Sequence, residues 1–227
     1  MKACVLLSGK IRNAKDCFDS IKTNLIDVYN ADVFISTWTT DEKDDVTIDE
    51  LTEMYSPKSI DVEKFDDELV NLFDKNVKPF KNNTYGIETR PLFVFLMYYK
   101  MMRVNRLKES YETLIGKKYD IVIRTRFDLK IDSKVEYIIP NENQIYIPKG
   151  WDWREGYNDL FAIGNSYSMG YYSNLYFSLV NMLNSGHVLH PELLLKSHLD
   201  RGGFEMIRPK MDLSLRGIKV HEKKVVY

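Results

Sequence analysis

The segment ACVLLSGK, residues 3–10, decides the fold that the sequence predicts. A continuous apolar run that stops at small residues is typical of a parallel strand buried on both faces. Apolar positions at helical spacing follow within residues 17–26, and a second apolar segment, residues 31–36, predicts another strand. Strand, helix and strand in this order predict a right-handed βαβ unit, and therefore an α/β protein with a mostly parallel central sheet flanked by helices.

The rest of the chain continues this alternation and fits one domain. At 227 residues the chain can bury one sizeable core, whereas two full domains would each be small. Residues 41–90 are acidic and weakly periodic, which predicts short helices and loops with one strand near residues 59–62. Further on, the pattern predicts helices at residues 92–110, 168–184 and 191–200, and strands at residues 121–129, 144–148 and 160–163.

The formal net charge of −1 conceals an uneven distribution along the chain. Residues 41–75 hold 13 acidic and 4 basic side chains, a net charge of −9, so the remainder carries +8. A basic remainder suits an anionic ligand such as a nucleotide diphosphate, although the acidic stretch itself is typical of a solvated helical face. The sequence has no dense stripe of Lys and Arg, so nucleic acid is not an expected partner.

Cysteine content and hydropathy bear on where the protein works. Cys4 falls inside the first apolar run and Cys17 within the first predicted helix, so both are expected to be small core residues in a reducing compartment. The longest apolar run, residues 92–99, is far shorter than the roughly 20 residues of a membrane span. The N-terminal apolar run is too short for a signal peptide. We therefore expect a soluble, cytoplasmic protein with no membrane span.

Charged side chains close the strand predicted at residues 121–129. Because side chains alternate along a strand, Arg124, Arg126 and Asp128 are predicted to share one face near its carboxyl end. Parallel α/β sheets bind ligands just beyond the carboxyl ends of their strands. There, arginines can clamp phosphate oxygens and an aspartate can hold a divalent cation. The alternative is an internal Arg–Asp ion-pair network that only caps the strand.

The end of the first strand adds Ser8, Gly9 and Arg12 to this prediction. Gly9 lets the backbone approach a ligand closely, and Arg12 offers a positive charge to phosphate. The segment lacks the GxGxxG pattern of a dinucleotide-binding loop, so alone it is a weak signal. Together the ends of two neighbouring strands predict one nucleotide pocket.

Six short motifs along roughly residues 1–200 carry a resemblance to a known family. The motifs are SGKIRN at residues 8–13, ADVFI at 31–35, YYK at 98–100, YD at 119–120, RTRFD at 124–128 and NDLFAIG at 158–164. In order and spacing they resemble those of small GT-A-type glycosyltransferases. Such enzymes occur in large DNA viruses, including the chlorella viruses whose capsid glycans they build, and in bacterial surface-polysaccharide loci.

The resemblance implies a single GT-A, Rossmann-like domain over residues 1–227, with a nucleotide-sugar-binding half at 1–130 and an acceptor half at 131–227. It implies transfer of a hexosyl or deoxyhexosyl group from a nucleoside-diphosphate sugar to a glycan or protein-linked glycan acceptor. In a viral member the compartment would be the host cytoplasm.

A divalent cation, Mn²⁺ or Mg²⁺, is the cofactor that the resemblance implies, held by a DXD-like element. Here that element reads Arg126-Phe127-Asp128, so arginine replaces the first carboxylate and Asp128 is left as the main metal ligand. Many such enzymes take another ligand from a C-terminal histidine. His221 fits that role by sequence order, with an exposed histidine in the tail as the alternative.

Inverting sugar transfer requires a carboxylate that accepts the proton of the acceptor hydroxyl. Asp159 is the first candidate for this catalytic base, because it follows a loop of aromatic residues whose rings can stack on sugar faces. The aromatic residues of the loop are Trp151, Trp153 and Tyr157. Glu192 is the second candidate, in a Pro-Glu pattern similar to that of family members. The alternatives are a loop-bracing hydrogen bond for Asp159 and helix capping for Glu192, and a retaining mechanism needs neither as base.

Two other classes of function stay open on the sequence. Arginine at the first DXD position also fits a non-catalytic nucleotide-sugar or carbohydrate-binding module, a degenerate family member without turnover. A phosphoryl- or nucleotidyl-transferring enzyme would use the same Asp–metal–phosphate chemistry, but the chain has no Walker loop. The products separate the classes: a glycosyltransferase releases a nucleoside diphosphate, a binding module releases nothing, and the third class releases phosphate or pyrophosphate.

Overall fold

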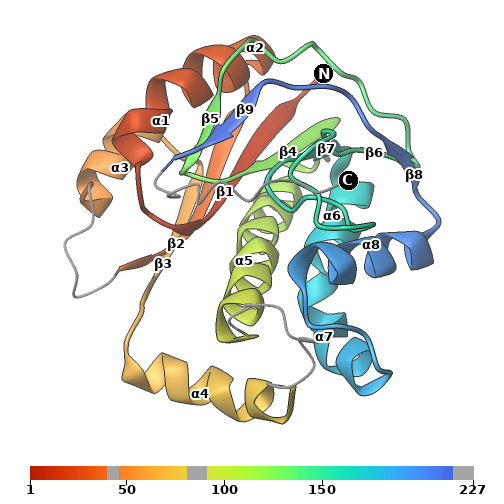
Figure 1. Ribbon diagram of the computed structural model, residues 1–227. Coiled ribbons are helices and arrows are strands. Elements are labelled where there is room, and N and C mark those ends of the chain that lie inside the picture. The colour runs from red at the N-terminus through yellow and green to blue at the C-terminus, as the bar shows by residue number, and fades with distance from the viewer. Residues whose placement is uncertain (40–45, 81–90, 217–227) are drawn as a thin grey trace.

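A central sheet with helices on both of its faces organises the chain (Figure 1). The computed structural model describes residues 1–39, 46–80 and 91–216. The α/β class and the mostly parallel sheet that the sequence predicts are confirmed. The first βαβ unit is the one predicted from residues 3–10, and its first strand is buried from Ala3 to Ser8 because both of its faces are covered.

Seven strands of the described residues make up the central sheet. They are β1 (Ala3–Lys10), β2 (Asp32–Thr39), β3 (Ser59–Lys64), β4 (Ile121–Thr125), β6 (Gln144–Tyr146), β7 (Ala162–Gly164) and β8 (Glu205–Ile207). Their order across the sheet is β3-β2-β1-β4-β7-β6-β8. The pairs β3–β2, β2–β1, β1–β4 and β6–β8 are parallel, whereas β7 runs antiparallel to both β4 and β6. The carboxyl ends of β1, β2 and β4 therefore lie at one edge.

The N-terminal helices cover one face of this sheet, together with a small second sheet (Figure 1). These elements are α1 (Ala14–Ile21), the π-helical turn η1 (Lys22–Ile26), α2 (Asp27–Tyr29), α3 (Ile48–Tyr55), and the antiparallel strands β5 (Leu129–Ile131) and β9 (Leu213–Leu215). Cys17, Ile21 and Leu25 recur at helical spacing and pack with Val5 and Leu7 of β1 in one apolar core. Both cysteines of the chain are free and buried, as expected for small core residues.

The longer helices cover the other face, with α5 running along the sheet and α7 and α8 beside it (Figure 1). They are α4 (Asp67–Val77), the 3₁₀ turn η2 (Lys78–Phe80), α5 (Pro91–Ile115), α6 (Ser166–Ser173), α7 (Leu175–Asn184) and α8 (Pro191–Gly202). Asn165 caps α6 in a reciprocal capping box with Ser168, and Pro191 occupies the first turn of α8, where its missing N–H costs nothing.

The structure differs from the elements predicted from the sequence in three places. The strand predicted at residues 121–129 ends at Thr125, because β7 accompanies it only to Arg124 and β1 only to Thr125. The chain turns at residues 126–128 and then pairs with β9 as β5. The helix predicted at residues 168–184 is two helices, α6 and α7, which meet at Asn174. Beyond the last predicted helix, the chain adds two strands, β8 and β9.

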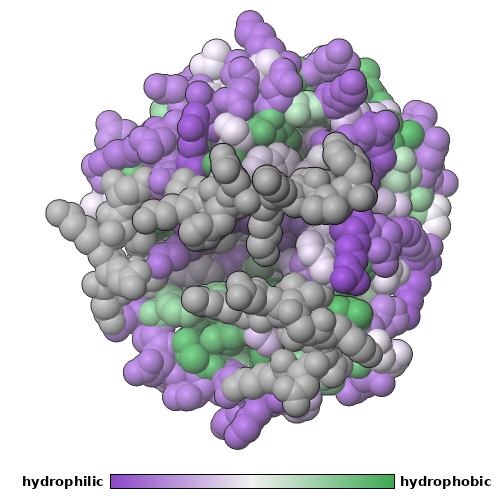
Figure 2. Space-filling view, viewed as in Figure 1, coloured by the Kyte–Doolittle hydropathy of each residue, from purple (hydrophilic) through white to green (hydrophobic). Residues whose placement is uncertain are grey.

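Figure 2 shows the hydropathy of the residues on one face of the molecule. Hydrophilic residues cover most of its periphery, and hydrophobic residues gather in one area of its lower half. Among the described residues, no helix combines the length and the apolarity that crossing a membrane requires.

Candidate active site

Asp128 is held by two arginines at the carboxyl edge of the sheet. Arg126 donates from Nε to Oδ1 at 2.8 Å and from Nη2 to Oδ2 at 2.9 Å, and Arg12 donates from Nε to Oδ2 at 2.6 Å. The Asp128 side chain is only 3% exposed, so burial would raise the pKa of its carboxyl, but Arg126 and Arg12 bring the pKa below its ordinary value. For these residues the structure contains the ion-pair network that the sequence left as the alternative.

The side chains of the two arginines are more exposed than that of the aspartate between them. The side chain of Arg12 is 50% exposed and that of Arg126 20% exposed. Burial alone would lower the pKa of Arg126, but the charges of Asp128 and Asp159 raise it above its ordinary value. We call Arg12 and Arg126 the guanidinium pair.

Arg124 does not belong to this network. It pairs with Leu6 on β1, and it lies on the same face of β4 as Val122, which packs in the core beneath α5. The residue is 1% exposed, yet its Nε and Nη1 have no hydrogen-bond partner among the described residues. Burying such donors is costly unless something satisfies them, so Arg124 points to a bound ligand or water.

Other buried polar groups without partners lie near Arg124. Within the described part of the chain, the Tyr172 hydroxyl, Nδ1 of His190 and Oε2 of Glu192 make no hydrogen bond. Burial raises the pKa of Tyr172, and the positive charge of Arg124 offsets part of this rise. Asp159, which is 6% exposed, acts electrostatically on the same tyrosine and on Glu192. We call Arg124, Asp159, Tyr172, His190 and Glu192 the buried polar cluster.

Glu192 and Asp159 form a carboxyl pair inside this cluster. Burial first, and then the negative charge of Asp159, raise the pKa of Glu192 to about 8. The Glu192 carboxyl is therefore largely protonated at neutral pH. Its Oε2 lies 3.5 Å from Nδ1 of His190, whose own pKa burial lowers, so the imidazole is neutral under the same conditions.

Close packing between a loop and α8 fixes the position of Glu192. A Cβ on Gly156 would lie 2.7 Å from Cβ of Glu192, so only glycine permits this approach, and Tyr157 N donates to the Glu192 carbonyl at 3.2 Å. Trp153 stacks on His190 with ring centroids 4.2 Å apart. Asn158 braces the loop by donating from Nδ2 to the Pro148 carbonyl at 2.5 Å.

The end of β1 reaches the same edge. Leu7 pairs with Thr125, so Ser8 and Gly9 lie beside the point where β4 leaves the sheet. Gly9 has φ of 114°, a conformation that side-chain-bearing residues rarely adopt, and its carbonyl accepts a hydrogen bond from Thr37 Oγ1 at 2.8 Å. Ser8 is buried. The sequence therefore predicted correctly that these two strand ends adjoin.

A divalent cation fits this arrangement poorly. Both oxygens of Asp128 already accept hydrogen bonds from guanidinium groups, and the described residues contain no group of three His, Cys, Asp or Glu that could hold a metal. His221, the other ligand suggested by sequence order, lies outside the described residues. We therefore derive no step through a metal ion.

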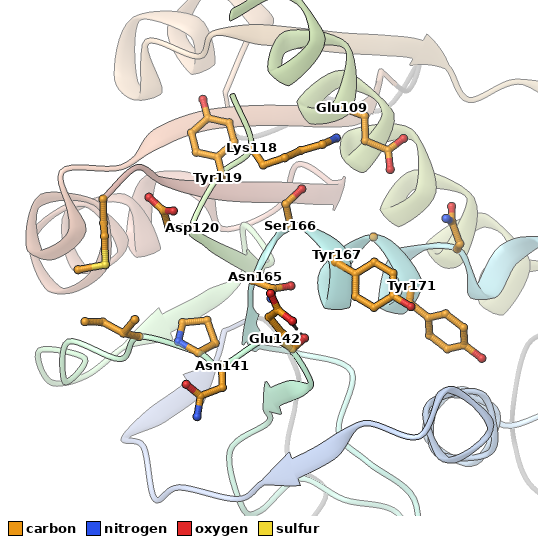
Figure 3. A pocket seen from close by; sticks show the side chains of 15 residues that line it. Glu109, Lys118, Tyr119, Asp120, Asn141, Glu142, Asn165, Ser166, Tyr167 and Tyr171 are labelled. Carbon is orange, nitrogen blue, oxygen red and sulfur yellow. Dashed lines mark hydrogen bonds between the residues drawn. The ribbon is translucent and has the colours of Figure 1, made fainter. Parts of the chain in front are cut away.

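A cavity lies at the opposite edge of the sheet. Figure 3 shows this cavity of about 760 Å³, which Tyr119 and Asp120 line just before β4 begins, and Asn165 and Tyr167 just after β7 ends. It contains none of the residues that the sequence predicted for the nucleotide pocket. Parallel α/β sheets bind ligands beyond the carboxyl ends of their strands, so we place the candidate active site at the other edge.

Three residues of the site were missed in the sequence. Tyr98 and Tyr172 fall in helices and resemble ordinary core residues, and Tyr98 donates to the Pro191 carbonyl at 2.8 Å. His190 stands directly before Pro191-Glu192, and this proximity to a candidate base was the one available signal. A scan of protein-family models finds no match to the chain, and no curated protein matches it.

Proposed function

We propose that this chain is a glycosyltransferase that moves a sugar from a nucleoside-diphosphate donor to a hydroxyl of a glycan acceptor. One observation carries the proposal: Arg124, a buried arginine with unpartnered donors, acts with Asp159 on the same buried tyrosines, Tyr98 and Tyr172, at the carboxyl edge of a parallel sheet. Buried polar atoms without partners are rare in folded proteins, and a group of them at this edge suits a polar ligand.

Positive charge at the site suits the departing diphosphate. Sugar transfer passes through an oxocarbenium-like state while the leaving group gains negative charge. Fixed donors aimed at the developing charge lower the barrier, and the guanidinium pair, Arg12 and Arg126, has N–H groups beyond those bound to Asp128. Gly9 would let the backbone at the end of β1 approach the same phosphates.

Asp159 is the carboxylate proposed to accept the acceptor proton. The pKa of Glu192 is raised to about 8, so this carboxyl is largely protonated at neutral pH and Asp159 is the better proton acceptor. Glu192 instead acts as a neutral group near Asp159, with a protonated carboxyl that is a hydrogen-bond donor. The proton of the acceptor hydroxyl passes to Asp159 as the oxygen attacks the anomeric carbon and the diphosphate leaves.

Aromatic rings beside the carboxyl pair suit a sugar acceptor. Trp153 stacks on His190, and Trp151, 49% exposed, lies in the same loop. Aromatic faces bind the apolar faces of sugars, and partly exposed indoles offer that surface without refolding. A glycan acceptor bound here would have its hydroxyl close to Asp159.

Release of nucleoside diphosphate tests the proposal. The purified chain is incubated with a panel of UDP- and GDP-sugars and a mixture of oligosaccharide acceptors, and the freed nucleoside diphosphate is measured. We expect release with at least one donor, and a fall of about 100-fold in Asp159→Asn, because removal of a general base typically costs two to four orders of magnitude. Asp200→Asn, an exposed change on α8, is the matched control and should leave release unchanged.

Two outcomes would contradict transfer. Binding of a donor without any release indicates the non-catalytic binding module. Release of phosphate or pyrophosphate in place of nucleoside diphosphate indicates the phosphoryl- or nucleotidyl-transfer class.

A further inference from the structure

The orientation of Asp128 bears on how the donor diphosphate is bound. Its two carboxylate oxygens receive three N–H donors, two from Arg126 and one from Arg12, at 2.6 to 2.9 Å. Hydrogen bonds between ionised partners at these distances are the strong ones, and a two-pronged Arg–carboxylate contact also fixes the plane of the guanidinium. These donors use three of the roughly four lone-pair sites of the carboxylate, which leaves little capacity for a metal ion.

Exposure is graded across the same three side chains. Asp128 is 3% exposed, Arg126 20% and Arg12 50%. Asp128 is thus the least exposed of the three side chains, and Arg12 offers the most surface to solvent. Nη1 and Nη2 of Arg12, and Nη1 of Arg126, make no hydrogen bond within the described residues, so donors remain for an anion.

The balance of charge at this edge points the same way. The buried polar cluster contributes the positive charge of Arg124 and the negative charge of Asp159, while its Glu192 carboxyl is neutral at pH 7. The guanidinium pair adds two positive charges against the one negative charge of Asp128. A net positive site can take up a diphosphate without a metal ion to neutralise it.

We propose that Arg12 and Arg126 bind the donor diphosphate directly, and that Asp128 positions them in place of ligating a divalent cation. Donor binding and sugar transfer then need no metal ion. Asp128 is a positioning residue, since it acts through the two arginines. The inference rests on the proposed function, because it concerns the diphosphate of the same donor.

Binding of nucleoside diphosphates with and without metal tests this inference. UDP and GDP are titrated calorimetrically into the chain in EDTA and again in MnCl₂. We expect one of them to bind with the same affinity, within about twofold, in both buffers. Arg12→Gln should weaken that binding at least about tenfold in EDTA, because a charge-assisted contact to phosphate is lost.

Lys22→Gln is the matched control. Lys22 is 48% exposed and ion-paired with Asp27, so this change removes the same charge from a side chain of similar exposure outside the site. Affinity should stay within about twofold of the parent. Thermal unfolding of both variants checks that they fold, as half-exposed side chains should permit.

Asp128→Asn separates positioning from ligation. An amide keeps one acceptor for the guanidinium pair but is a poor metal ligand, so binding in EDTA should weaken about tenfold and gain nothing from MnCl₂. Mn²⁺ should likewise give no stabilisation of the parent in the absence of nucleotide.

The remaining outcomes overturn the inference in distinguishable ways. Binding that falls about tenfold or more in EDTA and returns with MnCl₂ contradicts metal-free binding, and an Arg12→Gln variant with parental affinity contradicts phosphate binding by Arg12. Either result leaves the proposed transferase function standing. If neither UDP nor GDP binds in either buffer, and no nucleotide sugar releases its diphosphate, both proposals are lost.

Discussion

Two groups of buried charges lie at opposite edges of the same sheet, and they differ in whether their hydrogen bonds are complete. At the edge where β4 begins, Lys108 is fully buried and donates to Ser166 Oγ at 2.7 Å, with its Nζ 3.6 Å from Glu112. Glu112 in turn accepts from Lys118 at 3.1 Å and from Tyr119 N at 2.9 Å. At the carboxyl edge, five atoms of the buried polar cluster have no hydrogen-bond partner among the described residues.

The difference separates charges whose hydrogen bonds the fold completes from charges whose hydrogen bonds it leaves open. The Lys108–Glu112 pair uses its hydrogen bonds internally, so it ties α5 to α6 and to the start of β4. The cluster around Arg124 has open donors and acceptors, which a folded protein retains only where something else will fill them. Burial alone would not distinguish the two groups, because Lys108 and Arg124 are both almost fully buried.

The largest effect on stability is expected at the closed pair. Lys108→Met leaves the buried Glu112 short of one cation and should lower the free energy of unfolding by about 3 kcal/mol. Urea unfolding measures this loss. Adding Glu112→Gln should restore part of it, and nucleoside-diphosphate release per folded molecule should stay at the parental value. A cost below about 1 kcal/mol would show that the pair is not structural.

Arg124→Met is the matched change at the buried polar cluster. It should affect nucleoside-diphosphate release strongly and stability only slightly. Stability should change by less than about 1 kcal/mol, because Nε and Nη1 lose no partner. Release of nucleoside diphosphate should fall about 100-fold, equivalent to roughly 3 kcal/mol, if the guanidinium meets the reacting group. Steady-state kinetics and urea unfolding of the same preparation measure both. An Arg124→Met variant that loses stability but releases nucleoside diphosphate at the parental rate would contradict this prediction.

The third effect concerns the pH dependence of stability. The pKa of Glu192 is raised to about 8 in the folded chain, whereas the pKa of a glutamate in an unfolded chain is roughly 4.3. The folded state thus holds a proton that the unfolded state releases, so stability declines as pH rises between these two values, by at most about 1.4 kcal/mol per pH unit. Glu192→Gln cannot ionise and should lose this decline.

Urea unfolding at pH 5, 7 and 9 checks the prediction for Glu192. The variant should gain stability relative to the parent as pH rises, reaching on the order of 2 kcal/mol at pH 9, because the side chain is only 15% exposed. A difference that is the same at all three pH values would mean that Glu192 titrates normally.

The smallest effect is expected from two hydroxyls. Tyr119 donates to Asp32 at 2.7 Å, so Tyr119→Phe should cost about 1 kcal/mol. The Tyr172 hydroxyl has no partner among the described residues, so Tyr172→Phe should be neutral or slightly stabilising. Thermal unfolding of the pair compares them directly. Equal losses would indicate that the hydroxyl of Tyr172 is satisfied, and would weaken the case for an open cluster.

Local patterns predicted the fold well where neighbours in sequence are also neighbours in space. The apolar run of β1 and the helical spacing of Cys17 and Ile21 depend on local periodicity, and both were right. The end of β4 was wrong because it depends on how far β1 and β7 extend beside it, which residues 121–129 do not encode. Alternation therefore could not show that Arg126 and Asp128 leave the strand and turn toward Arg12.

The sequence revealed the charged residues of the candidate site, but not which groups they contact. Arginine and aspartate after an apolar strand are conspicuous in a sequence, since burying them has a cost. Tyr172 and Tyr98 are not, because a tyrosine on a helix is usually a core residue, and only the fold shows which hydroxyl stays unpartnered. Whether Asp128 faces a metal or two guanidinium groups likewise depends on tertiary contacts.

The contact between Gly156 and Glu192 couples the aromatic loop to the titrating carboxyl. A sugar that settles on Trp153 would displace water from the same recess and make the protonated carboxyl still more favourable. Acceptor capture would then draw a proton from solution, and its heat would vary with the ionisation enthalpy of the buffer. The absence of a side chain at Gly156 thus lets acceptor binding to the loop change the protonation of Glu192.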